Sequence, residues 1–184
     1  MDLYPIFLTA HQQMETVLEY VREGNLLQFR DPAFVKELRN RIRFHPREAI
    51  RTGDGLSGLV TGQPPVPRWF GRLVFSLVAS GKKQSDKDVV HIRSSAGIIA
   101  FVGECDDKAN WIEAGRAYER FALYAAASGV KNAFINQPIE VRPLRPQLLS
   151  WLGLRDKHVH LLARFGEGPT VAHSLRRPVD EVLV

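Results

Sequence analysis

Apolar positions near the start of the chain recur at the spacing of a helix. They lie within the segment 12–23 and share one helical face, at Met14, Val17, Leu18 and Val21. Gly24 follows directly and supplies a C-terminal stop, since glycine readily adopts the left-handed conformation that ends many helices. The pattern predicts a short amphipathic helix over 12–23.

A second helix is predicted from its start signal. Asp31 is a suitable N-cap, and Pro32 suits the first helical position because its missing N–H would have no intrahelical partner there. The apolar stripe of this helix continues until Pro46 and consists of Phe34, Val35, Leu38 and Ile42.

The middle of the chain changes character twice. Residues 52–67 are dense in glycine and proline, which predicts a loop that crosses the surface or lines a ligand site. Residues 68–80 are apolar nearly all round and predict a helix packed on two sides. We interpret its Trp69 and Phe70 as core residues first and as pocket walls second. The polar segment 81–88 is interpreted as a linker.

The second half alternates between strand and helix signals. A run of apolar residues at 97–104 predicts a strand buried on both faces. Asp106 and Asp107 then open a long helix, about 108 to 128, which Gly129 closes. A strand at 133–136, a helix at 145–152 and a strand at 158–165 follow. This order predicts an α/β fold with a sheet of three or more strands, packed by helices that include one long central helix.

Bulk properties exclude several classes of protein. The formal net charge is +5, but the basic residues are scattered and match no nucleic-acid-binding motif, so we predict no nucleic-acid partner. Cys105 is the single cysteine, which excludes an internal disulfide and fits the reducing cytoplasm. The N-terminus does not read as a signal peptide, and no apolar run approaches the roughly 20 residues that span a bilayer. We therefore predict a cytoplasmic protein without a membrane partner.

Few residues carry a local catalytic signal. The common phosphate-loop, serine-hydrolase and zinc-protease motifs are missing from the sequence. His158 and His160 would lie on one face of a strand, and we favour a polar strand face over a metal site because no further ligand motif accompanies them. Cys105 could be a reactive thiol at a helix start, although an inert buried or half-buried cysteine is favoured. No catalytic residue or metal ligand is assigned.

The C-terminal tail carries a sharper signal. Arg176 and Arg177 occupy an irregular stretch that Pro178 stiffens, and guanidinium groups bind phosphate through paired hydrogen bonds. A solvated basic tail is the alternative, and local sequence by itself favours that alternative.

The ordered motifs of the chain resemble a known family. The run WIEAGRAYERFALYAAASGVKNAFINQPIEVRPLRPQLLSWLGL, the strand ending in RFGEGP and the tail HSLRRPVDEVL are similar to the C-terminal half of nitroreductase-like flavoproteins, especially the Acg-type FMN-binding nitroreductases. The earlier segments EGNLLQFRDPAFVKELRNRIRF, DGLSGLVTGQPPVPRWFGRL and HIRSSAGIIAFVG resemble the same branch. The resemblance therefore covers nearly the whole chain.

The resemblance implies an α+β nitroreductase-like fold in which two halves or two subunits enclose FMN, with NAD(P)H as the hydride source and a small-molecule electron acceptor. It implies that Arg176, with Arg177 as the neighbouring possibility, holds the FMN phosphate. It also implies that Asn136 and Gln137, with Pro138 and Ile139, approach the isoalloxazine ring. The alternative for Asn136 and Gln137 is that they cap a strand end and turn.

One departure from the family limits what the chain is expected to do by itself. The family's N-terminal flavin-binding segments have no counterpart in the sequence. We therefore expect a single partial domain over 1–184: a helical lead-in at 1–50, a loop, helix and linker at 51–90, and an α/β core with its tail at 91–184. A fragment, a homodimer or complementing N-terminal half, and a fold without catalysis all remain open. The leading hypothesis is an FMN-dependent oxidoreductase; the alternatives are a non-catalytic FMN-binding or sequestering protein and a partner-binding domain.

Overall fold

The computed structural model describes residues 3–58, 60, 65–171 and 177–183, with the backbone alone at 76–78. The chain divides into two compact units. The first consists of Met1–Gln28 with Gly81–Gly168, and the second of Phe29–Ser80 with Pro169–Val184.

A four-stranded antiparallel sheet forms the centre of the first unit. Its strand order is β1 (Tyr4–Leu8), β4 (Gly97–Gly103), β6 (His158–Gly166) and β5 (Lys131–Phe134). The strands predicted near 97, 133 and 158 are thus present, with β5 beginning two residues earlier than expected. Strand β1 was not predicted, because five residues with one proline carry too little alternation to be recognised locally. Its edge position tolerates Pro5, since proline cannot donate to a central ladder.

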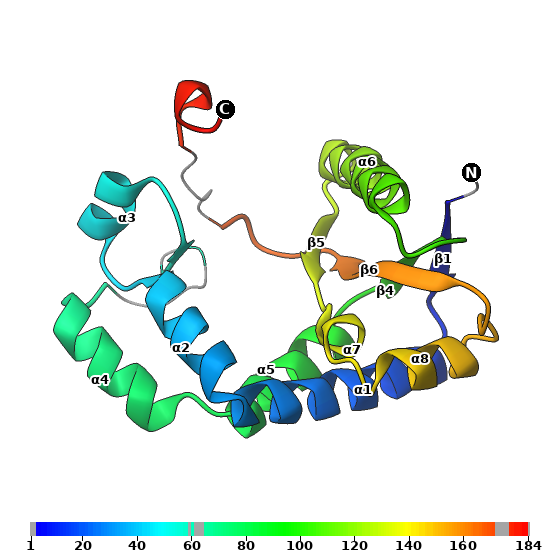
Figure 1. Ribbon diagram of the computed structural model, residues 1–184, viewed down its shortest axis with the longest axis horizontal. Coiled ribbons are helices and arrows are strands. Elements are labelled where there is room, and N and C mark those ends of the chain that lie inside the picture. Colours follow the sequence, from blue (N-terminus) through cyan, green and yellow to red (C-terminus); the bar gives the residue numbers. More distant parts are fainter. Residues whose placement is uncertain (1–2, 59, 61–64, 172–176, 184) are drawn as a thin grey trace. The chain divides into compact units, whose positions relative to one another are not determined.

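Helices cover both faces of this sheet (Figure 1). Helix α6 (Lys108–Ala127) lies on one face, and Asp107 caps it as predicted by accepting a hydrogen bond from the Asn110 N–H at 2.8 Å. The opposite face carries α1 (His11–Arg30), α5 (Gly81–Arg93), α7 (Gln137–Glu140) and α8 (Arg145–Trp151). The prediction of a sheet packed by helices that include the long helix α6 is confirmed, and α1 has the same length of 20 residues.

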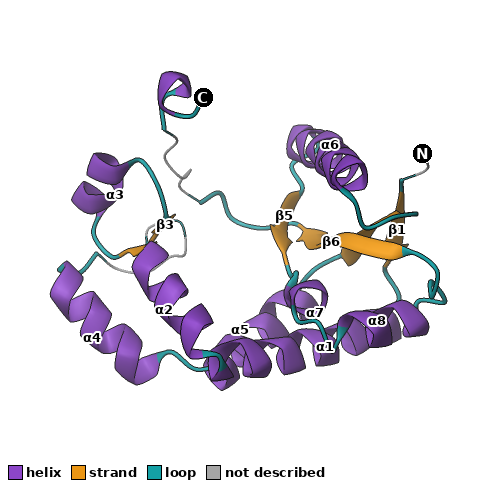
Figure 2. Ribbon diagram, in the orientation of Figure 1, coloured by secondary structure: helices purple, strands orange, loops and turns teal. Residues whose placement is uncertain are grey.

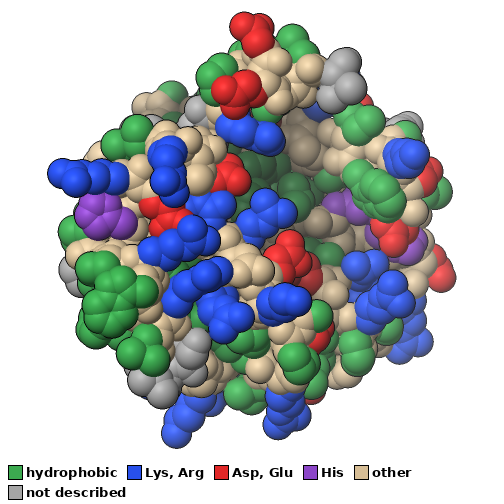
Figure 3. All heavy atoms as spheres, turned by 60° about the vertical axis from the view of Figure 1, so that its left-hand side comes forward, with side chains coloured by type: hydrophobic (Ala, Val, Ile, Leu, Met, Phe, Trp, Pro, Cys, Tyr) green, Lys and Arg blue, Asp and Glu red, His purple; other side chains and the backbone are tan. Residues whose placement is uncertain are grey.

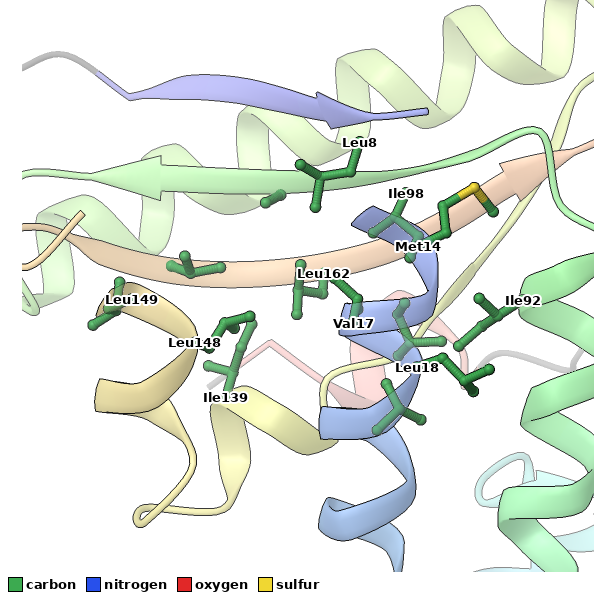
Figure 4. Packing of buried hydrophobic residues seen from close by; sticks show 14 of the residues in the cluster. Leu8, Met14, Val17, Leu18, Ile92, Ile98, Ile139, Leu148, Leu149 and Leu162 are labelled. Atoms are coloured by element: carbon green, nitrogen blue, oxygen red, sulfur yellow. The ribbon is translucent and has the colours of Figure 1, made fainter. Parts of the chain in front are cut away.

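The core lies between the sheet and these two layers. Leu18, Ile98, Leu148 and Leu162 belong to the larger cluster, on the side of α1, α5, α7 and α8 (Figure 4). A smaller cluster around Phe101 packs against α6. Successive side chains of β4 point to opposite faces of the sheet and pack in the two different clusters. Every residue of this strand is therefore buried. The predicted burial on both faces is confirmed.

Two local predictions in this unit were wrong. Helix α1 does not stop at Gly24 but continues to Arg30, and Gly24 instead permits a close approach to Gln137. The segment 81–88 is not a linker but the start of helix α5. The buried face of α5 includes the polar residues Ser85 and Asp88, so the sequence of this helix lacks the apolar stripe that would have predicted it.

The second unit is built from short elements (Figure 2). They are α2 (Pro32–Arg41), β2 (Ile42–Arg43), α3 (Pro46–Thr52), β3 (Leu56–Ser57), α4 (Arg68–Val78) and the 3-10 helix η1 (Val179–Glu181). Asp31 caps α2 through a 2.8 Å bond from the Ala33 N–H, as predicted, but the helix ends at Arg41 rather than near Pro46.

Strands β2 and β3 pair in parallel, so the predicted loop 52–67 contains a short strand. The Arg43 guanidinium bonds Asp54 at 2.8 Å beside this pair and holds the pKa of that carboxyl below its usual range. On α4, Trp69 is 70% exposed and Phe70 is 42% exposed. Our interpretation of these two residues as core was therefore wrong, because the apolar surface of the helix exceeds what this small unit covers.

Candidate functional site

A β-bulge in the pairing of β4 with β6 sets the geometry of the candidate site around His158 and His160. Phe101 of β4 pairs with Leu161, whereas the next residue, Val102, pairs with Val159, so His160 has no partner across the ladder. Bulges of this kind re-aim side chains and occur often beside active sites. The rings of His158 and His160 stack with centroids 6.3 Å apart. The prediction that they share one face of a strand is confirmed.

The His160 imidazole is held over Gly103. A side chain at Gly103 would place its Cβ 2.8 Å from His160 Nε2 and 2.9 Å from Asn110 Oδ1, so the close approach needs glycine. Both of these polar atoms are buried, and neither has a hydrogen-bond partner in the described part of the chain. Burial lowers the pKa of His160 below its usual 6.5, although the nearby Asp106 carboxylate opposes this shift. The site thus favours a neutral imidazole.

Asp106 joins three elements at the same end of the sheet. Its carboxylate follows β4 and accepts hydrogen bonds from Trp111 Nε1 of α6 at 2.8 Å and from Arg145 Nη1 of α8 at 3.3 Å. The Trp111 bond is the main reason why the pKa of Asp106 is lowered, and the Arg145 charge adds to it. Arg145 also donates from Nε to the carbonyl of Ile139 in α7 at 2.9 Å.

These side chains line a cavity of about 390 Å³. Its walls consist of Asp106, Trp111, Ala114, Gly115, Ile139, Arg145, His158, Val159, His160 and Leu161. A second cavity of about 470 Å³ shares Asp106, Arg145 and His158 with the first and adds Arg155. The first volume lies within the range of small-molecule pockets, and the lining combines apolar walls with a few convergent polar groups. Within the described residues, no set of three His, Cys, Asp or Glu side chains is arranged to hold a metal ion.

The depressed pKa of His160 makes a testable prediction. Between pH 6.5 and the lower pKa of the folded state, the unfolded chain binds a proton that the folded chain does not, so stability falls as the pH falls through this window. Replacing His160 by glutamine removes this contribution. We expect the fall in melting temperature from about pH 7.5 to about pH 5.5 to be smaller in His160→Gln than in the parent protein.

Differential scanning fluorimetry at matched ionic strength measures this difference. His91→Gln is the control, because it makes the same substitution at an exposed histidine on α5. Equal falls in all three proteins would contradict the assignment.

The structure gives Asn136 and Gln137 clear partners. Asn136 Oδ1 accepts the Leu162 N–H at 2.8 Å, at the end of β5. Gln137 Nε2 donates to Asn25 Oδ1 at 3.2 Å, and Asn25 donates in turn to Asp88 at 2.8 Å. Both side chains thus help to hold the fold. In the residues described, however, no acceptor receives the backbone N–H of Asn136 or of Gln137.

Of the two predicted phosphate ligands, the structure describes Arg177, which belongs to the second unit. Arg177 is exposed and makes no ion pair with any described residue, and its Cγ would lie 3.4 Å from a Cβ built on Gly53. Arg176 lies outside the described residues. Whether Arg177 and the turn at Asn136 converge on one ligand stays a prediction. Cys105 is exposed, so the favoured interpretation of a buried or half-buried cysteine was wrong.

Asp106, Trp111 and Arg145 were not singled out as binding residues from the sequence. Asp106 and Trp111 carried a weak signal, since an acid at a helix start and an indole five residues later can meet across the first turn. Arg145 lies thirty-nine residues beyond Asp106, and the sheet and its connections decide their proximity.

Comparison with known proteins identifies the fold. No family model and no curated protein matches the sequence. Among solved structures, the chain is similar to the crystal structure of a nitroreductase-like family protein from Bacillus cereus, with a TM-score of 0.51. The match covers 99% of this chain and 72% of that one at 12% sequence identity. The chain has a nitroreductase-like fold.

The predicted fold is therefore confirmed at the level of architecture, as a mixed α/β arrangement around an antiparallel sheet. The Acg-type assignment and FMN binding stay predictions at this level of similarity. None of the described helices is both long and apolar enough to cross a bilayer.

Proposed function

We propose that this chain binds FMN and belongs to an oxidoreductase of nitroreductase type. In this proposal, hydride passes from NAD(P)H through the flavin to an electrophilic acceptor such as a nitroaromatic compound or a quinone. The flavin supplies the electron-transfer chemistry, and the protein binds and orients it. The observation that carries the proposal is the pair of unengaged backbone N–H groups at Asn136 and Gln137, within a nitroreductase-like fold.

Those two N–H groups suit the ring edge of a flavin. They are successive donors at the turn between β5 and α7, and the Asn136 side chain fixes the turn by accepting the Leu162 N–H. A flavin ring presents acceptors at N5 and O4, so donors held in place would orient the ring and tune it. The side chains of Asn136 and Gln137 would act as positioning groups, because Asn136 Oδ1 and Gln137 Nε2 are already bonded within the fold, whereas Gln137 Oε1 is buried without a partner among the described residues.

The charge of the second unit suits the phosphate. Its segments contain eleven Lys and Arg against six Asp and Glu, whereas the first unit has fourteen of each, so the net charge of +5 resides in the second unit. Figure 3 shows Lys and Arg side chains gathered on the face of this unit that is turned forward. An excess of positive charge attracts anions such as phosphate. Arg177, which has no described ion pair, is our candidate ligand together with Arg176.

Removing the Arg177 guanidinium should weaken FMN binding. A charge-assisted bond to phosphate contributes roughly 1.5 to 3 kcal/mol, so we expect Arg177→Ala to raise the Kd for FMN at least about tenfold. Quenching of flavin fluorescence during titration measures the Kd. Arg120→Ala, which removes an exposed guanidinium from α6, should bind FMN as the parent does. An unchanged Kd in Arg177→Ala would remove the assignment of this residue.

Two further measurements test the function itself. The parent protein should take up FMN, turn yellow and oxidise NAD(P)H when an electrophilic acceptor is added. Uptake of FMN without NAD(P)H oxidation would identify a flavin-sequestering protein instead. A protein that binds no FMN would overturn the proposal.

A further inference from the structure

Gly115 lies in the interior of α6, where glycine is unfavourable. Glycine is less stable than alanine inside a helix because its backbone loses more freedom on folding. Such a residue is usually explained by tight packing, yet a side chain built on Gly115 would meet no other atom within 4 Å. Gly115 lines the cavity beside the two histidines. Gly115 is exposed, so its missing side chain leaves the open side of that cavity unobstructed rather than making room for a neighbouring element.

The polar end of the same cavity offers donors that the fold does not use. Arg145 engages Nε with Ile139 and Nη1 with Asp106, while its second amino nitrogen has no acceptor in the described structure. The His158 ring has no hydrogen-bond partner among the described residues either. Both groups can donate hydrogen bonds to the two oxygens of one ligand carboxylate.

The charge balance indicates how much negative charge fits. Asp106 offsets Arg145, and Arg155 in the adjoining cavity adds one further positive charge. Arg155 does not line the cavity itself, where Asp106 and Arg145 cancel, so a singly charged ligand is repelled by Asp106 less strongly than a phosphate dianion would be.

The remaining walls of the cavity indicate what the uncharged part of the ligand is. Ala114, Ile139 and Leu161 are apolar, and Trp111 and the two stacked imidazoles add flat side chains to the lining. Flat side chains bind flat apolar rings by stacking and edge contacts. The cavity of about 390 Å³ is large enough for a small aromatic molecule.

We propose that this cavity binds a small aromatic carboxylate, with the carboxylate on Arg145 and His158 and the ring beside Gly115. The site uses side chains of β6, α6, α7 and α8 and does not use the backbone N–H groups assigned to the flavin. Binding of the carboxylate can therefore be tested without FMN, and the two proposals can fail separately.

The test uses the whole chain with benzoate and 2-naphthoate as probes. Isothermal titration calorimetry and tryptophan fluorescence should both show saturable binding at one site. Gly115→Leu places a side chain in the open side of the cavity and keeps every polar side chain, so we expect its Kd to rise at least about tenfold. Ala126→Leu adds the same side chain at an exposed position of the same helix and should bind as the parent does.

Two further comparisons test the polar end. Benzamide has the same shape as benzoate without the charge, and the parent protein should bind it at least about tenfold more weakly than benzoate. Arg145→Gln lacks the guanidinium, and this variant should bind benzoate at least about tenfold more weakly than the parent does. Arg142→Gln changes an exposed arginine nearby and should leave the Kd unchanged. A melting temperature of Gly115→Leu at or above that of the parent shows that this variant folds.

The absence of saturable binding by either carboxylate would overturn the proposal. Parent-like binding by Gly115→Leu would overturn it as well, because the ring could not then lie beside Gly115. Equal affinity for benzamide and benzoate would overturn the role of the charged end.

Discussion

Leu162→Ala is expected to lower the free energy of unfolding by about 2 to 5 kcal/mol. Leu162 lies in the centre of β6, is fully buried, and packs in the larger core cluster between the sheet and its helices. Truncation removes buried apolar area and leaves a cavity that the surrounding strands and helices can fill only in part. Because β6 pairs with both β4 and β5, its core contacts support three of the four strands.

Urea unfolding followed by circular dichroism measures this change. Leu123→Ala is the matched control, since Leu123 is 66% exposed on α6 and its truncation should change stability by less than about 0.5 kcal/mol. A small effect at Leu162 would mean that the core is not organised around this strand.

Gly24→Ala should destabilise the protein by about 1 to 3 kcal/mol, even though alanine is the better helix former. A Cβ on Gly24 would lie 2.7 Å from Gln137 Cβ and 3.1 Å from the Gln137 carbonyl carbon. These atoms belong to the start of α7, whose position is set by the hydrogen bonds of Asn136 and Gln137. Relief of the clash therefore needs a movement of backbone rather than of a flexible side chain.

The same substitution at Gly115 should act in the opposite direction. Gly115 lies in the other twenty-residue helix, and no atom would contact its new methyl group. We expect Gly115→Ala to raise the free energy of unfolding by roughly 0.5 to 1 kcal/mol, the difference in helix propensity. Thermal and urea unfolding of the pair, side by side, checks the signs. Two changes of the same sign would show that the environment of one glycine is misassigned.

The Gly24 contact also connects the core to the proposed flavin segment. Gln137 touches Gly24 and bonds Asn25, and Asn25 bonds the buried Asp88 of α5. The turn that would face the ring is thus fixed by a polar network inside the first unit. We expect Gly24→Ala to disturb this turn, and so it should not be used to test ligand binding at the cavity beside Gly115.

Several features of this protein follow from sequence alone because they depend on neighbours along the chain. The caps at Asp31 and Asp107 are hydrogen bonds to N–H groups two or three residues away, and both were predicted. The buried strand β4 and the long helix α6 have uninterrupted patterns over 7 and 20 residues. The resemblance in motifs also indicated the nitroreductase-like fold that the structural comparison supports.

Tertiary structure decided the rest, because the stabilising contacts join residues far apart in the chain. Strand β1 exists through pairing with β4, some ninety residues later, and α5 buries Ser85 and Asp88 against partners on α1. The bulge at His160 and the close approach over Gly103 arise where two strands meet out of register. A local sequence pattern indicates which secondary structure a segment prefers, but not which distant segment packs against it. The candidate cavity is formed by residues from segments that are distant in sequence, so the pattern could not predict it.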